Sequence, residues 1–448
     1  MVDMRNYTRR TSNRGARTAK PSVAAELEPI LSLLFGGAVP LRIRAWDGSE
    51  VGPPDGPVMV LRHRRALRRL VWSPDEVGIA RAYVAGEIAV DGDLVEALDA
   101  VLHLFDVRDG LKLTTQDRAT IVRTALRLGA VGPNPRPPAE EVPQLRGRTH
   151  SVRRDAAAIS HHYDVSNAFY ERVLGPSMTY SCAYWRDPDD PAATLEQAQA
   201  DKCELICRKL GLKPGDRLLD VGCGWGTLAL HAAAEHGVRV VGVTISREQA
   251  EYAAKRAVAA GLADQVEIRR QDYRELDDGP FDAIASVGMA EHVGLPQWGA
   301  YADALYRLLK PGGRLLNHQI TERPKELPKK PPRTFIRSYV FPDGELLPVG
   351  TVSDQLEWHG FEVRDVESLR EHYARTLRSW VANLERDWTE CVRLTSIGRA
   401  RVWRLYMAAC ALAFERNRVA IHQVLAVRPG TAGNSAMPAT REAWFGVS

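Results

Sequence analysis

The segment that most constrains the fold is a glycine-rich turn between an apolar strand and a helix, within the run LLDVGCGWGT at 218–227. Three glycines, Gly222, Gly224 and Gly226, stand at alternate positions. Because glycine has no Cβ, the backbone can turn tightly here and approach a ligand. The GxGxG spacing differs from the GxGxxG of dinucleotide-binding turns and suits a nucleoside–amino acid ligand better than a pyrophosphate. Taken alone, the turn is also compatible with a purely structural role.

Short apolar strands alternate with helical segments after this turn. Strands are predicted at 217–221, 238–243, 266–270, 283–287 and 314–319, and helices at 227–235, 247–260 and 297–309. Lys310–Gly313 is expected to form a turn before the fifth strand. Further strands are predicted at 362–366 and 419–427, with long helices between them. The alternation predicts an α/β fold with a doubly wound, Rossmann-like parallel sheet.

Polar residues follow the predicted strands at the edge where such sheets bind ligands. Thr244 and Gln249 follow the second strand and can meet a ribose or an amino acid end. Asp272 follows the third and can accept a hydrogen bond from an exocyclic amine, and Tyr273 can stack on a purine. The fourth strand leads into 286–294, SVGMAEHVG. Four such strand ends in succession favour a nucleoside cofactor over a structural turn.

The chain divides into four regions by composition. Residues 1–22 are a basic tail expected to be disordered, and 23–130 form a first domain with strands at 41–46 and 59–63 and helices at 24–34, 77–85, 94–105 and 116–128. The run GPNPRPP at 132–138 excludes a helix or central strand, so 131–150 is a predicted linker. Residues 151–448 form the second domain.

Composition excludes several classes of function. No apolar stretch reaches the roughly 18–20 residues of a membrane span, and the polar, basic first residues do not predict a secretory signal. The six cysteines form no CxxC pair and no His/Cys spacing matches a zinc site, so no metal is expected. Cys203 and Cys207, one helical turn apart, suit core packing, and the free cysteines suit a reducing cytoplasm. No nucleic-acid-binding motif is present.

Seven motifs in order give the chain a family resemblance. They are HYDVSN at 162–167, MTYSCAYW at 178–185, LDVGCGWG at 219–226, GVTIS at 242–246 with Gln249, QDYR at 271–274, EHVG at 291–294 and YVFPDG at 339–344. Together they resemble the cyclopropane-fatty-acyl-phospholipid synthase family, which includes the mycolic acid cyclopropane synthases and actinobacterial enzymes that form 10-methylene chains. The resemblance spans roughly 150–428 and extends weakly to the first region.

The resemblance implies a class I methyltransferase sheet with helical insertions, a smaller N-terminal α+β domain and two bound molecules. One is S-adenosylmethionine, held by Tyr180, Ser181, Gly222, Gly224, Gly226, Thr244, Gln249 and Tyr273. The other is a bicarbonate ion, with Cys182, Glu291, His318, the backbone of Ile320 and Tyr373 as its ligands. Taken singly, the side chains of the second set are equally compatible with core packing.

The resemblance also implies the reaction. The double bond of an unsaturated acyl chain attacks the sulfonium methyl, and the resulting carbocation loses a proton to give a cyclopropane or, after a hydride shift, a 10-methylene branch. Bicarbonate would be the base, and water must be excluded because it would quench the cation. Faces of Tyr163, Phe169, Tyr180 and Tyr339 can stabilise the cation. The actinobacterial character of the composition favours the 10-methylene product, which a partner reductase would then saturate.

The front region implies where the enzyme works. In the family, a domain like 23–130 accompanies activity on phospholipid-bound acyl chains, which places the protein in the cytoplasm against the inner membrane face. Arg64, Arg65, Arg68 and Arg69 are the predicted headgroup contacts, with a solvated basic face as the alternative. The family also implies a homodimer. Two other functions stay open: a methyltransferase for a small molecule, and a non-catalytic lipid-binding protein.

Overall fold

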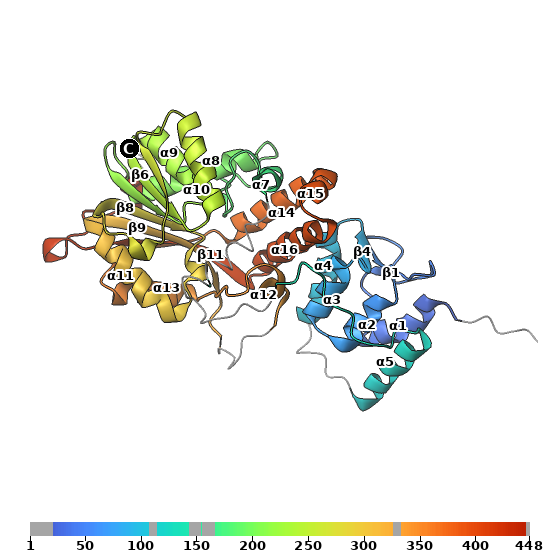
Figure 1. Cartoon of the computed structure of the whole chain (residues 1–448). Helices are drawn as coiled ribbons and strands as arrows, with labels where there is room; N and C mark the ends of the chain where they lie inside the picture. Colours follow the sequence, from blue (N-terminus) through green and yellow to red (C-terminus); the bar gives the residue numbers. More distant parts are fainter. Residues whose placement is uncertain (1–20, 107–113, 143–153, 155–165, 326–332, 445–448) are drawn as a thin grey trace, which may run out of the picture.

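The computed structural model describes residues 21–106, 114–142, 154, 166–325 and 333–444. Figure 1 shows a smaller N-terminal part, coloured blue to teal, beside a larger α/β part. Residues 162–165 of the HYDVSN motif, including Tyr163, and the basic tail up to residue 20 lie outside the described residues. Within them, no helix has the length and apolar character needed to cross a bilayer.

The N-terminal part is a small α+β domain with its own core. Its sheet has the order β2-β1-β3-β4. Leu27, Leu41, Ile43 and Ile88 are buried between this sheet and the helices. The elements are β1 (Arg42–Arg44), β2 (Glu50–Val51), β3 (Val58–Leu61), β4 (Ile88–Asp91), α1 (Val23–Phe35), α2 (Arg65–Trp72), α3 (Glu76–Val84), α4 (Leu94–Asp106) and α5 (Thr115–Arg127).

The larger part is built on a seven-stranded sheet of order β10-β11-β9-β8-β5-β6-β7. Neighbouring strands from β9 to β7 are parallel, and β11 is antiparallel to both β9 and β10. The α/β, Rossmann-like prediction is therefore confirmed. The strands are β5 (Arg217–Val221), β6 (Arg239–Thr244), β7 (Val266–Arg270), β8 (Phe281–Val287), β9 (Leu309–Glu322), β10 (Glu362–Ser368) and β11 (Val419–Val427).

Helices cover both faces of this sheet because successive strand residues point to opposite sides. Leu218 packs in one apolar cluster with α8 (Leu195–Leu210), α9 (Thr227–His236) and α10 (Arg247–Ala259). Leu219 packs in another with α11 (Trp298–Leu308) and α13 (Val349–Trp358). Figure 1 shows these two helical layers above and below the strands.

A helical insertion joins the two parts of the chain. Residues of α7 (Asn167–Leu174), α12 (Phe335–Tyr339), α14 (Arg370–Arg386), α15 (Trp388–Leu394) and α16 (Ile397–Glu415) share one apolar cluster with Tyr83, Val84, Leu94 and Val95 of the N-terminal domain. The first domain therefore packs directly on the insertion. Short turns at Tyr273–Glu275 (η1), Ala290–His292 (η2), Leu295–Gln297 (η3) and Thr431–Gly433 (η4), and α17 (Arg441–Trp444), complete the described elements.

One predicted turn differs from the structure. Lys310–Gly313 lies inside β9, at a register shift against β8, because Gly312 donates to the Arg428 carbonyl and Arg428 donates to the Gly313 carbonyl. The described half of the predicted linker is fixed to both parts of the chain. Glu141 in it pairs with Arg81 of α3, and Val142 donates to the carbonyl of Ser338 in α12.

Candidate active site

A pocket opens at the carboxyl ends of β5, β6, β7 and β8, the edge that the sequence predicted. Gly222, at φ 79°, lies in its wall, and a Cβ there would come 3.0 Å from Met289 Cγ. Any larger residue would therefore crowd the turn. Eight of the predicted cofactor residues line this one pocket: Tyr180, Ser181, Gly222, Gly224, Thr244, Gln249, Asp272 and Tyr273.

Gly226 is the predicted cofactor residue that does not line the pocket. It is the N-cap of α9 at φ 82°, and a Cβ there would lie 3.0 Å from the Cβ of Ala253 in α10. Its absence of a side chain therefore serves the close packing of α9 against α10. The third glycine of the motif is needed by the fold around the pocket.

The polar side chains of the pocket are partly paired with each other. Thr244 Oγ1 donates to Gln249 Oε1 at 2.9 Å. Arg274 pairs with both oxygens of Asp272, at 2.9 and 2.6 Å. The Asp272 carboxylate, which was predicted to accept a hydrogen bond from an exocyclic amine, would therefore also keep its contact with this guanidinium. The ring of Tyr273 packs edge-on against Tyr301.

Two buried charged groups in the pocket were not predicted from the sequence. Asp220 is the last residue but one of β5, with 2% of its surface exposed. Its Oδ2 has no hydrogen-bond partner among the described residues, and burial raises its pKa to about 7. Lys202 of α8, also 2% exposed, donates to Ser181 Oγ at 3.1 Å. Within the described chain, Lys202 has no carboxylate in ion-pair contact. The charge of Lys202 opposes the rise in the Asp220 pKa, and its described hydrogen-bond partner, Ser181, is neutral, so the ammonium can still pair with an anionic ligand.

Glu291 lies in η2, the short turn that follows β8 and the pocket-lining residues 287–289. Its Oε1 accepts a hydrogen bond from the Ile320 backbone at 2.8 Å, and its Oε2 has no partner. Burial raises the pKa of this carboxyl to about 7, and the Ile320 hydrogen bond opposes the rise. Glu291 is therefore poised to exchange a proton near neutral pH.

His318 lies on β9, fully buried and directly opposite Gln423 of β11. The amide nitrogen of Gln423 lies 3.0 Å from His318 Nδ1, while Nε2 has no partner. With the Gln423 amide as donor, Nδ1 accepts and the imidazole proton lies on Nε2. Burial lowers the pKa of His318, and the charge of Lys202 lowers it further. A neutral imidazole can therefore present an N–H to a ligand.

The remaining two predicted ligands are also buried. Burial raises the pKa of the Cys182 thiol and of the Tyr373 hydroxyl well above their ordinary values, so both stay protonated. Cys182 and Glu291 also raise the pKa of Tyr373, whereas the charge of Lys202 lowers the pKa values of Cys182 and His318. Contacts link these residues in two groups: Ile320 donates to Glu291, and the Leu369 carbonyl lies 3.7 Å from Cys182 Sγ and accepts from the Tyr373 amide at 3.1 Å. The Gly288 amide also donates to the His318 carbonyl, which ties this set to the pocket edge.

Aromatic rings surround the same region. Tyr180 contacts Trp380 and Trp403 with ring centroids 5.5 and 5.8 Å apart, and its hydroxyl donates to that of Tyr406 at 3.1 Å. Phe169 and Tyr339, also predicted, belong to the same apolar cluster. Of the residues that sequence reasoning missed, Gln423 could have been found as a polar residue within the apolar strand VAIHQVLAV. Lys202 had no such signal.

The side chains that line the pocket suit the chemical groups of S-adenosylmethionine. The unpaired Asp220 oxygen suits the α-ammonium of the methionine end, the Lys202 ammonium suits its carboxylate, and the polar groups of β6 and β7 suit the nucleoside. The sheet order, with one antiparallel strand beside five parallel strands and β10 at the edge, is that of the Rossmann-like methyltransferases. Fold and pocket together define an S-adenosylmethionine-dependent methyltransferase.

Comparison with known proteins narrows this class. The family model described as mycolic acid cyclopropane synthetase matches residues 150–424, and the chain belongs to this family. A Mycobacterium tuberculosis protein named "Probable fatty acid methyltransferase" is 42% identical over 411 residues, covering 90% of this chain and 94% of that protein. The cyclopropane-fatty-acyl-phospholipid synthase of Escherichia coli is 42% identical over 264 residues, 59% of this chain and 66% of that protein. The solved structure of mycolic acid cyclopropane synthase CmaA1 complexed with SAH and CTAB has a TM-score of 0.56 at 33% identity, covering 60% of this chain and 97% of that one.

Proposed function

We propose that this methyltransferase modifies the cis double bond of an unsaturated acyl chain in a membrane phospholipid, giving a cyclopropane or a 10-methylene branch. The observation that carries the proposal is the set of buried polar atoms without partners, Glu291 Oε2 and His318 Nε2, which the hydrogen bond from Gly288 to the His318 carbonyl joins to the pocket edge. A small-molecule methyltransferase needs the glycine turn and the pocket, but it has no use for this set or for the aromatic cluster beside it.

The unpaired atoms of this set favour a bound anion. Glu291 Oε2 and His318 Nε2 are buried without partners, and such groups cost about 1–3 kcal/mol each unless a ligand pairs with them. A protonated Glu291 and the neutral His318 would each donate a hydrogen bond to the anion. Bicarbonate has the size and the acceptor oxygens for such a site.

S-adenosylmethionine supplies an electrophilic methyl group, and bicarbonate would supply a base beside it. The chain's residues do the rest. Glu291, His318 and Tyr373 would orient the base by hydrogen bonds, because all three have buried polar groups and only a directed base can compete with side reactions. The rings of Tyr180, Trp380 and Trp403 would exclude water and face the developing cation.

A surface of the N-terminal domain supports the membrane part of the proposal. Arg64 and Arg65 of the α2 region are exposed, and Val71 and Trp72 at the end of α2 are 43% and 54% exposed. Trp72 Nε1 donates to the Gly132 carbonyl, beside the exposed Val131. Arginines next to exposed apolar side chains suit an anionic bilayer surface. The protein would then work in the cytoplasm, on the inner membrane face.

Arg69 has a different role from the one predicted. Only 7% of its surface is exposed, and its guanidinium pairs with both oxygens of Glu87 at 2.8 and 3.2 Å. It also donates to the Arg136 carbonyl. Arg69 therefore holds the domain together and is unavailable to headgroups. The membrane surface is reduced to Arg64, Arg65 and Arg68 with the neighbouring apolar residues.

The direct test uses S-adenosylmethionine with a trideuterated methyl group and vesicles of dioleoyl phosphatidylglycerol. We expect the fatty acids to gain one carbon and to retain two of the three deuterium atoms, because the proton is lost from the new methyl. Mass spectrometry with double-bond cleavage separates a methylene branch from a ring. Vesicles of distearoyl phosphatidylglycerol are the matched control and should gain nothing.

Two outcomes would contradict the proposal. If the protein binds the cofactor but labels no lipid, it is a small-molecule methyltransferase or a non-catalytic lipid-binding protein. If the product retains all three deuterium atoms, no proton is lost from the transferred methyl. The anion is tested separately: turnover in carbonate-depleted buffer should fall and recover on addition of bicarbonate. Turnover that is unaffected by depletion would remove bicarbonate from the mechanism.

A further inference from the structure

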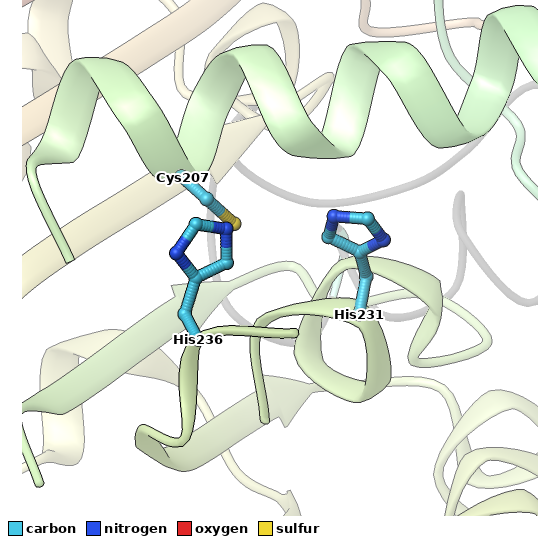
Figure 2. Close-up of side chains that lie close together, drawn as sticks. All are labelled: Cys207, His231 and His236. Carbon is cyan, nitrogen blue, oxygen red and sulfur yellow. The ribbon is translucent and has the colours of Figure 1, made fainter. Parts of the chain in front are cut away.

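A second cluster of reactive side chains lies between α8 and α9. Figure 2 shows Cys207 pointing from α8 toward the imidazoles of His231 and His236 on α9. The cysteine sulfur and one nitrogen of each imidazole all lie within 4.8 Å of one another. Cys207 is fully buried, and both histidines are about one-fifth exposed. The two imidazoles are therefore partly accessible to solvent.

Glu204 adds a fourth polar group, one helical turn before Cys207. Its Oε2 lies 3.3 Å from His231 Nε2 and 2.9 Å from His236 Nε2, so both imidazoles face the same carboxylate oxygen. Its Oε1 pairs with Arg208, which fixes the carboxylate in this orientation. Three ligand atoms, from Cys207, His231 and His236, therefore lie close together, and the Glu204 carboxylate contacts the two imidazoles.

The donor types decide which ligand suits this point. Thiolate, imidazole and carboxylate are the ligands of Zn²⁺, which binds four of them tetrahedrally at about 2.0–2.3 Å. Ligand atoms around such an ion stand about 3.3–3.8 Å apart by that geometry, so small side-chain rotations bring these atoms into place. Mg²⁺ and Ca²⁺ prefer oxygen ligands and suit the site poorly.

We propose that Cys207, His231, His236 and Glu204 form a binding site for Zn²⁺ that fastens α8 to α9. The site would act at a distance from methyl transfer, since none of the four residues lines the cofactor pocket. It would act on the scaffold: α8 carries Lys202 and α9 begins at the glycine turn. The spacing of histidines and cysteines along the chain predicted no zinc site, because Cys207 and the two histidines come from different helices.

The test measures metal in the full-length protein. After removal of metal with a chelator and addition of Zn²⁺, we expect one zinc per chain to survive gel filtration, measured by mass spectrometry of the elements. Co²⁺ in place of Zn²⁺ should give a thiolate-to-cobalt charge-transfer band, which reports sulfur ligation directly. Thermal unfolding should shift upward with Zn²⁺ concentration.

Matched variants decide whether these residues hold the ion. Cys207→Ser should abolish the charge-transfer band, whereas Cys203→Ser, the same change one turn earlier in α8, should keep it. The partly exposed His231→Gln should weaken zinc binding at least tenfold, and it tests the site even if Cys207→Ser does not fold. The proposal is overturned if the wild-type protein retains no zinc, or if its cobalt band survives Cys207→Ser.

Discussion

Glu291→Gln should make the protein more stable above neutral pH while it removes activity. The carboxyl is buried, it accepts a hydrogen bond from the Ile320 amide, and its pKa rises from 4.5 to about 7 on folding. The folded state therefore binds the proton more tightly than the unfolded state does. The stability that the protonated carboxyl provides is complete below pH 4.5 and is lost as pH rises through 7.

The magnitude follows from that difference in pKa. One pKa unit corresponds to about 1.4 kcal/mol, so the ionised carboxylate lowers the free energy of unfolding by about 3 kcal/mol at pH 8. Glutamine keeps the shape of the side chain and never ionises. We expect the two proteins to differ little at pH 5 and the variant to be more stable by up to about 3 kcal/mol at pH 8.

The assay is urea unfolding at both pH values in carbonate-depleted buffer, because bound bicarbonate would stabilise the wild type. Glu251→Gln, the same change at an exposed glutamate of α10, is the control and should alter stability equally at both pH values. If Glu291→Gln has the same effect at pH 5 as at pH 8, the carboxyl does not titrate in a buried site and the reasoning fails.

Four further changes test other parts of the structure. Lys202→Met should weaken S-adenosylmethionine binding at least tenfold in calorimetry, because a buried ammonium in the pocket is lost; exposed Lys255→Met should leave it unchanged. Gln423→Leu should lower turnover and shift its pH profile while cofactor affinity stays constant, because His318 loses the bond that fixes its proton. Gly226→Ala should destabilise the fold by about 1–3 kcal/mol, since a Cβ would meet Ala253 at 3.0 Å, and chemical unfolding measures this loss. Glutamate in place of Arg64, Arg65 and Arg68 should reduce flotation with anionic vesicles, whereas the same change at Arg239, Arg247 and Lys255 should not.

Local sequence patterns determined the strands, the glycine turn and the edge of the sheet that binds the cofactor. The predicted bounds of β5, β7 and β11 agree with the structure residue for residue, because runs of apolar residues between turn signals define a buried strand locally. Local sequence also located the turn at Gly222 and Gly224, because both residues have the positive φ angles that glycine adopts easily. Motifs in order then identified the family before any contact was known.

Tertiary structure alone decided which of these residues act together. The pairing of His318 with Gln423 depends on the register of β9 against β11, 105 residues apart in the chain. The burial of Lys202, the structural role of Arg69 and the convergence of Cys207 with two histidines likewise come from packing between distant segments. Burial also sets the pKa of Glu291, and a sequence pattern does not contain the surroundings that desolvate a carboxyl.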